Sequence, residues 1–117
     1  MRTAFFRDGS PDCPLVAIAD FEPAEVVTLR SEVMSLASGE STSAVLEGDV
    51  HLTLQVGKRD IGILNRGTSR LVCVLRPLAW EQVADLLEPF TEPGQQGFQW
   101  LDQTGDVKLL ISRTGKW

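Results

Sequence analysis

The chain has 117 residues, 43% hydrophobic and 23% charged, a composition that excludes wholesale disorder and suits one globular domain spanning residues 1–117. Its net charge of −5 at pH 7 argues against a general affinity for nucleic acid or anionic lipid. No apolar run approaches the roughly 20 residues that cross a bilayer, and the N-terminal stretch lacks a signal peptide's apolar segment, so we expect a cytoplasmic protein without membrane contact.

The first elements along the chain are a strand pair and a helix. The apolar run LVAIAD, which begins at Leu15, predicts a buried strand that can pair with TAFFRD before it. The next segment, PAEVVTLRSEVMSLASG, has the length and punctuation of a helix. Pro23 suits the first helical position, and Gly39 suits the C-terminal stop.

From Ser43 onward the hydrophobic period changes to two, which predicts strands. VHLTLQV alternates apolar and polar residues, and we expect Gly48-Asp49 before it to form a two-residue hairpin turn with positive φ at Gly48. The short connections GKRD and NRGTS favour antiparallel neighbours. RLVCVL is apolar on both faces, which predicts a central strand covered on each side by a helix, a loop or a second subunit.

The last third of the chain predicts a second helix and a closing strand pair. PLAWEQVADLLEPF opens on Pro77 and is amphipathic. FQWLD and DVKLLIS follow as strands, and no long internal repeat appears. Asp102 to Gly105 and Ser112 to Gly115 both read as three-residue hairpin turns with glycine in the left-handed region.

These elements predict an α+β fold in the order ββ-α-ββββ-α-ββ. We expect a single, predominantly antiparallel sheet of about six to eight short strands with two amphipathic helices packed on it.

Arg30 is a first candidate binding residue because it falls on the apolar arc of the first helix. A guanidinium there can point into a pocket and bind a carboxylate or phosphate. Alternatively its stem covers apolar surface while its head reaches solvent or a structural acid such as Glu22.

His51 is the only histidine, which excludes a metal site or a base mechanism that needs two imidazoles. On the polar face of its strand it is either a lone acid or base or a solvated ring.

Cys73 is expected to be a small core residue and Cys13 an unreactive loop thiol. Neither cysteine has metal-ligand spacing, so we predict no metal and no cofactor.

Two charged features remain. Glu81, Asp85 and Glu88 form an acidic helix face, which by default is solvated. Residues 58–76 carry five basic residues and one acid, and they either protect sheet edges from aggregation or contact an anionic ligand.

Because convergent titratable groups are nearly absent, the sequence favours a non-catalytic binding or regulatory protein that acts through protein–protein contact. Self-association through the RLVCVL region is one version of this hypothesis. The alternatives are a pocket for a small molecule or anion at Arg30, and an enzyme with His51 as its acid or base. Trp100 and Trp117 are candidate partner contacts, although Trp117 can instead fold back and plug the end of the sheet.

Overall fold

The computed structural model describes residues 1–67 and 69–117, so one residue of the expected NRGTS connection lies outside the described part. In chain order the elements are β1 (Arg2–Phe6), β2 (Leu15–Ala19), α1 (Pro23–Ser38), β3 (Ser43–Glu47), β4 (His51–Val56), β5 (Gly62–Asn65), β6 (Arg70–Leu75), α2 (Pro77–Leu87), the 3-10 turn η1 (Glu88–Thr91), β7 (Phe98–Asp102) and β8 (Lys108–Ser112).

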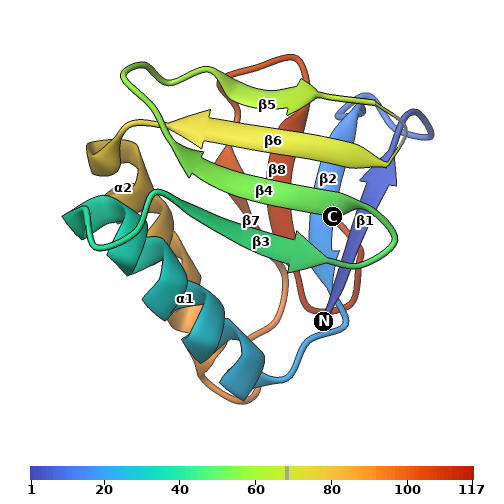
Figure 1. Ribbon diagram of the computed structural model, residues 1–117. Helices are drawn as coiled ribbons and strands as arrows, with labels where there is room; N and C mark the ends of the chain where they lie inside the picture. The colour runs from blue at the N-terminus through green and yellow to red at the C-terminus, as the bar shows by residue number, and fades with distance from the viewer. Residues whose placement is uncertain (68) are drawn as a thin grey trace.

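The expected α+β class and both helices are confirmed, but the prediction of one mostly antiparallel sheet is wrong. The strands form two four-stranded mixed sheets: sheet A, with the order β1-β2-β8-β7, and sheet B, with the order β3-β4-β6-β5. In each sheet a parallel pair, β2 with β8 or β4 with β6, joins two antiparallel hairpins. In Figure 1 the strands of sheet B run roughly from left to right, and the strands of sheet A run roughly from top to bottom behind them.

The two halves of the chain have the same topology, although no long repeat was expected. Each half is a ββαββ unit, and exchanging the halves turns the strand order of sheet A into that of sheet B. Each helix begins with a proline in its first turn, Pro23 in α1 and Pro77 in α2. Because every sheet takes one hairpin from each half, neither half can form a sheet of this kind alone.

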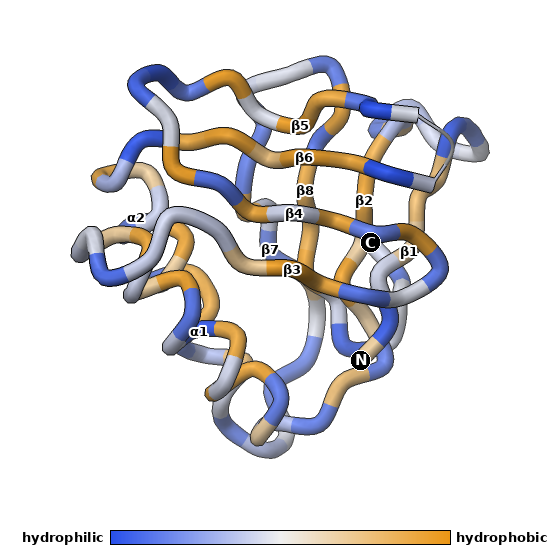
Figure 2. The backbone as a smooth tube through the Cα atoms, in the orientation of Figure 1, coloured by the Kyte–Doolittle hydropathy of each residue, from blue (hydrophilic) through white to orange (hydrophobic). Residues whose placement is uncertain are grey.

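The main core lies between the sheets and the helices. Buried residues recur at identical spacing in the two helical segments: Val26, Leu29, Val33 and Leu36 in α1, and Trp80, Val83, Leu87 and Phe90 in α2 and η1. They meet the inner faces of both sheets, and Figure 2 shows hydrophobic residues along most of β2, β6 and β8. A second, smaller cluster of buried residues, Leu15, Ala17 and Leu110, lies on the outer face of sheet A.

Two predicted turns differ from expectation. Strand β3 ends at Glu47 and pairs with His51, so the loop between them has three residues rather than two. Gly48 and Gly105 are not among the glycines with positive φ. Their lack of a side chain instead allows close packing of each hairpin tip against another strand, whereas Gly115 does have the expected left-handed conformation, with φ 78°.

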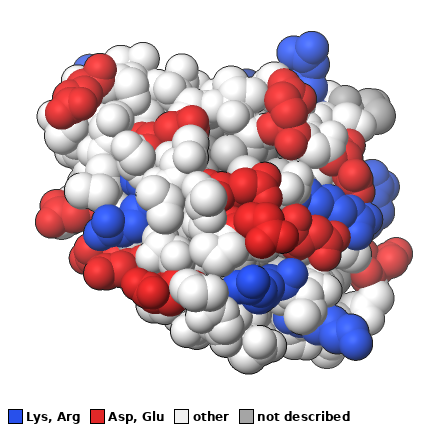
Figure 3. Space-filling model, turned by 90° about the horizontal axis from the view of Figure 1, so that it is seen from below, with Lys and Arg blue, Asp and Glu red and all other residues white. Residues whose placement is uncertain are grey.

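Charged side chains are unevenly placed on the surface. On the face seen from below, acidic side chains gather near the middle and basic side chains lie apart from one another (Figure 3). No described helix is both long enough and apolar enough to span a membrane.

Candidate functional site: the groove beside β1

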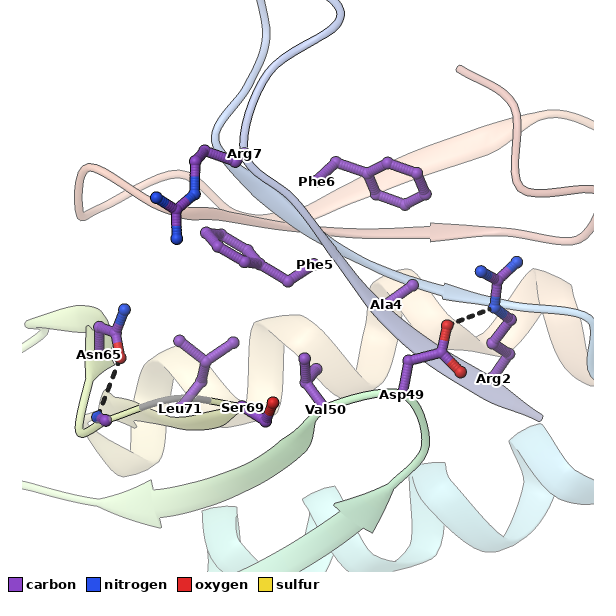
Figure 4. A pocket seen from close by; sticks show the side chains of 11 residues that line it. Arg2, Ala4, Phe5, Phe6, Arg7, Asp49, Val50, Asn65, Ser69 and Leu71 are labelled. Atoms are coloured by element: carbon purple, nitrogen blue, oxygen red, sulfur yellow. Dashed lines mark hydrogen bonds and ion pairs between the residues drawn. The ribbon is translucent and has the colours of Figure 1, made fainter.

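The two sheets touch at the start of β1 and separate along the rest of that strand. At the tip of the β3–β4 hairpin, the Val50 N–H donates a hydrogen bond to the Thr3 carbonyl at 3.1 Å. Beyond this contact lies an open groove of about 640 Å³ (Figure 4). Its walls come from β1, the β3–β4 turn, the β5–β6 loop and the start of β6: Arg2, Ala4, Phe5, Phe6, Arg7, Asp49, Val50, Asn65, Gly67, Ser69 and Leu71.

The groove has an apolar floor and a polar rim. Phe5 is half-buried and points from β1 toward Leu71 on the opposite wall (Figure 4). Together with Val50 these residues pack against or within the main core, which holds the floor in place. At the rim, the Arg2 Nε donates to the Asp49 carboxylate at 2.9 Å. Arg7 is exposed and forms no ion pair with the rest of the described chain, so its charge is available to a ligand.

The edge of β1 that faces the groove has free backbone groups. In an antiparallel pair, the N–H and C=O of a residue point to one side of the strand, and successive residues alternate between sides. Since the Thr3 carbonyl points away from β2 to meet Val50, the Phe5 amide and carbonyl also point away from β2. No turn or loop hydrogen bond within the described residues uses them. The groove therefore combines an open strand edge with an apolar floor and a free cation.

The equivalent junction on the other side of the molecule is formed by the second hairpin tip. There the tip of the β7–β8 hairpin meets β5, and Ile63 forms an antiparallel bridge with Val107. The backbones touch directly, since a Cβ on Gly62 would lie 2.6 Å from the Gly105 nitrogen. The two junctions thus make corresponding contacts, Val50 with Thr3 and Val107 with Ile63, and the groove lies beyond the first of them, beside β1.

Arg30 does not line this groove; it joins the two helices. Its Nε donates to the Ala84 carbonyl on α2 at 2.9 Å, and its Nη2 lies 3.8 Å from a Glu88 carboxylate oxygen. Its side chain is 27% exposed, so the stem is covered while the head reaches a structural acid. That acid is Glu88 rather than Glu22.

His51 lies on the outer face of sheet B, outside the groove. Its Nδ1 is 2.6 Å from the Glu47 Oε1. The ring is 32% exposed on an open sheet surface and is not among the residues that line the groove. The structure therefore supplies a carboxylate for a histidine acid or base, but places the pair on a flat face rather than in a cleft.

The two candidate tryptophans share the outer face of sheet A. The Trp117 ring packs on Phe6 with 5.1 Å between ring centroids, and its Nε1 donates to the Ser10 hydroxyl at 3.3 Å. Trp100 lies at the other side of the same cluster, with the Lys108 ammonium 5.6 Å from its ring centroid. Trp117 thus folds back onto the outer face of sheet A.

The two thiols lie in different surroundings, Cys73 in the core and Cys13 in a loop. Burial, with a smaller contribution from the nearby Asp102 charge, raises the pKa of the Cys73 thiol well above its usual range, so it stays protonated. Cys13 is half-buried beside Ser10. Within residues 1–67 and 69–117, no group of three or more histidine, cysteine, aspartate or glutamate side chains converges as a metal site.

The sequence reasoning missed Phe5 and Arg7. The available signal was Arg7 itself, a cation near the end of the predicted strand TAFFRD. What could not be seen was the wall opposite, since Asn65, Ser69 and Leu71 are more than fifty residues away along the chain.

Comparison with known proteins does not identify this fold or site: no family model, curated protein or solved structure matches the chain.

Proposed function

We propose that this protein is a non-catalytic binding protein that takes up an extended peptide segment of a partner in the groove beside β1. The partner strand adds to the free edge of β1, and an acidic residue of the partner pairs with Arg7. The observation that carries the proposal is the unpaired, outward-facing backbone of Phe5 at an apolar groove.

Peptide addition at a strand edge uses main-chain hydrogen bonds for affinity and side-chain pockets for selectivity. The groove offers both, since the Phe5 amide and carbonyl are free at the edge of β1 and Val50 and Leu71 line the floor beside that edge. The free stretch from Ala4 to Arg7 would accept about four residues at about 3.4 Å each. Apolar side chains at alternate positions of the peptide would face the floor.

The charge at the rim favours an acidic peptide. Arg2 is already neutralised by Asp49, whereas Arg7 has no carboxylate partner among the described residues. A charge-assisted hydrogen bond between Arg7 and a partner carboxylate would also fix the register of the added strand.

A random peptide library displayed on phage, selected on the purified protein, tests the proposal. Selected peptides should contain acidic residues and should bind Arg7→Glu on the order of tenfold more weakly, because an attraction becomes a repulsion. Lys58→Glu is the matched control, since Lys58 is also an exposed cation but does not line the groove. The Lys58→Glu variant should bind the selected peptides as tightly as the parent protein does.

A second readout separates strand addition from simple charge attraction. N-methylation of the selected peptide at alternate amides removes the donors that would face β1, and binding should be lost. Methylation of the other set should leave binding in place. The proposal is overturned if neither methylation pattern weakens peptide binding, or if the selection enriches no peptide.

A further inference from the structure

The pseudo-symmetry of the fold gives each sheet an outer face, and only one of the two is covered. On sheet A the register aligns Trp100, Leu110, Ala17 and Ala4 in a row across the four strands. The C-terminal segment folds over this face, with the Ser112 hydroxyl donating to the Lys116 carbonyl at 2.6 Å. Leu110 and Ala17 are consequently buried.

The corresponding row on sheet B is uncovered. Register aligns Val45, Thr53, Val72 and Leu64 across its four strands. Val45, which corresponds to Trp100, is 47% exposed. Sheet B faces the viewer in Figure 1, and no segment of the described chain crosses in front of it.

A charged row flanks this apolar row on the same face. Glu47 pairs in register with His51, and His51 with Arg70, so the three side chains follow one another across β3, β4 and β6. Glu47 and Arg70 are both exposed. Two strand spacings, about 10 Å, separate the strands that carry them. Arg70 has no ion-pair partner within the described residues, and Glu47 contacts only His51 in that set.

This arrangement is complementary to itself. When two copies stack face to face about a two-fold axis parallel to β4, the β3 strand of one lies over the β6 strand of the other. Glu47 then meets Arg70 of the second copy, and the symmetry repeats this contact on the other side of the axis. The same operation places Val45 against Val72 of the second copy, which buries the part of the apolar row that lies on β3, β4 and β6.

We propose that the outer face of sheet B is a homodimer interface, defined by Val45, Glu47, His51, Thr53, Arg70 and Val72. The second copy takes the place that the C-terminal segment has on sheet A. The three strands that overlap, β3, β4 and β6, span about 14 Å across and about 17 Å along the strands. That area is well below the roughly 800 Å² per partner of a standard protein interface, so the dimer is weak, with a Kd in the micromolar range or above.

Sedimentation velocity of the full chain from about 1 µM to 1 mM tests this interface. The protein should pass from monomer to dimer over that range. Glu47→Arg alone and Arg70→Glu alone should each raise the dimer Kd at least tenfold. Each substitution places like charges against each other at both of the symmetry-related contacts. The double variant should restore dimerisation toward the parent value, since both contacts are then remade with reversed sign.

Arg59→Glu and Glu40→Arg are matched controls, because both residues are exposed and lie outside β3, β4 and β6. They should leave the dimer Kd unchanged, as should Arg7→Glu in the groove. Circular dichroism of each variant verifies that it is folded. Any of three results would overturn the proposal: a monomer at every concentration, a dimer that the single substitutions do not weaken, or a double variant that does not recover dimerisation. A monomer at every concentration is also the result expected if another protein occupies this face.

Discussion

Gly48 and Gly105 occupy equivalent positions in the two halves of the chain, and each presses the tip of a hairpin against the first strand of a half. Gly48 contacts Thr3 of β1, and Gly105 contacts Gly62 of β5. Both are followed by aspartate and valine. These contacts join sheet A to sheet B at two places, one in each half of the fold.

Gly48→Ala should destabilise the protein by about 2 kcal/mol, because overpacking of this kind typically costs about 1–3 kcal/mol. The added Cβ would lie 2.5 Å from the Thr3 nitrogen, which is backbone and cannot rotate away. Gly105→Ala should cost less, since the nearest atom to its Cβ is the Ile61 carbonyl oxygen at 3.1 Å. Urea unfolding of both variants checks the order. Equal stability of the two variants would contradict the steric account.

Trp117→Ala should lower the free energy of unfolding by about 2 kcal/mol, less than for a fully buried tryptophan. The substitution removes the contact with Phe6 and the hydrogen bond to Ser10, and it uncovers the outer face of sheet A. Lys116→Ala is the control and should change little, since the Lys116 side chain is exposed and its carbonyl is retained. Thermal unfolding measures both. If Trp117→Ala matched the parent, the ring would not act as a plug.

Local elements of this fold could be predicted from the sequence, whereas the partition into two sheets could not. Proline and glycine mark the ends of α1, and the period of two marks β4. Parallel pairing of β2 with β8 joins residues more than ninety positions apart, such as Val16 and Leu109. Nothing local specifies such a pairing, because short connections report only on consecutive strands.

A usable signal for the repeated architecture was nevertheless present. Gly-Asp-Val occurs at residues 48–50 and again at 105–107, each time directly before a strand, β4 or β8. The matching spacing of apolar residues in the two helices supports the same alignment. A short motif of this kind is easily passed over when repeats are sought as long stretches of identity. The groove was beyond reach even so, since its walls meet only after both sheets have formed.

Asp60→Asn should remove part of the protein's acid sensitivity. The Asp60 carboxylate accepts hydrogen bonds from the Arg76 side chain at 3.0 and 3.2 Å and from the Arg76 N–H at 2.9 Å, at the start of α2. The Arg76 side chain, and then its backbone N–H, hold the pKa of Asp60 below its usual value. A lowered folded-state pKa stabilises the protein above the unfolded-state pKa of about 4, and this contribution is lost as the pH falls through the lower folded-state value.

Urea unfolding at pH 7 and at pH 2.5 checks this expectation. At pH 7 Asp60→Asn should be less stable than the parent by at most about 1 kcal/mol, because the pair is solvent-screened. At pH 2.5 the gap should narrow, because the stabilisation from the lowered pKa of Asp60 is lost as the pH falls below the unfolded-state value toward the folded-state value. Asp85→Asn serves as the control, because Asp85 is exposed and has no ion pair within the described chain. A gap that is the same at both pH values would show that the ion pair contributes nothing.

Arg30→Met should distinguish a structural arginine from a ligand-binding one. Methionine keeps much of the apolar stem but loses the hydrogen bond from Nε to the Ala84 carbonyl and the longer contact with Glu88. A charged donor to a backbone carbonyl contributes about 1.5–3 kcal/mol, and retained packing offsets part of that loss, so unfolding should become easier by about 1 kcal/mol. Glu88→Gln should have almost no effect, because Glu88 is exposed and its 3.8 Å contact is long.

Peptide binding in the groove should be unaffected by either Arg30→Met or Glu88→Gln, since neither residue lines the groove. If Arg30→Met left stability unchanged but abolished binding of the selected peptides, Arg30 would belong to the recognition surface and not to the helix interface.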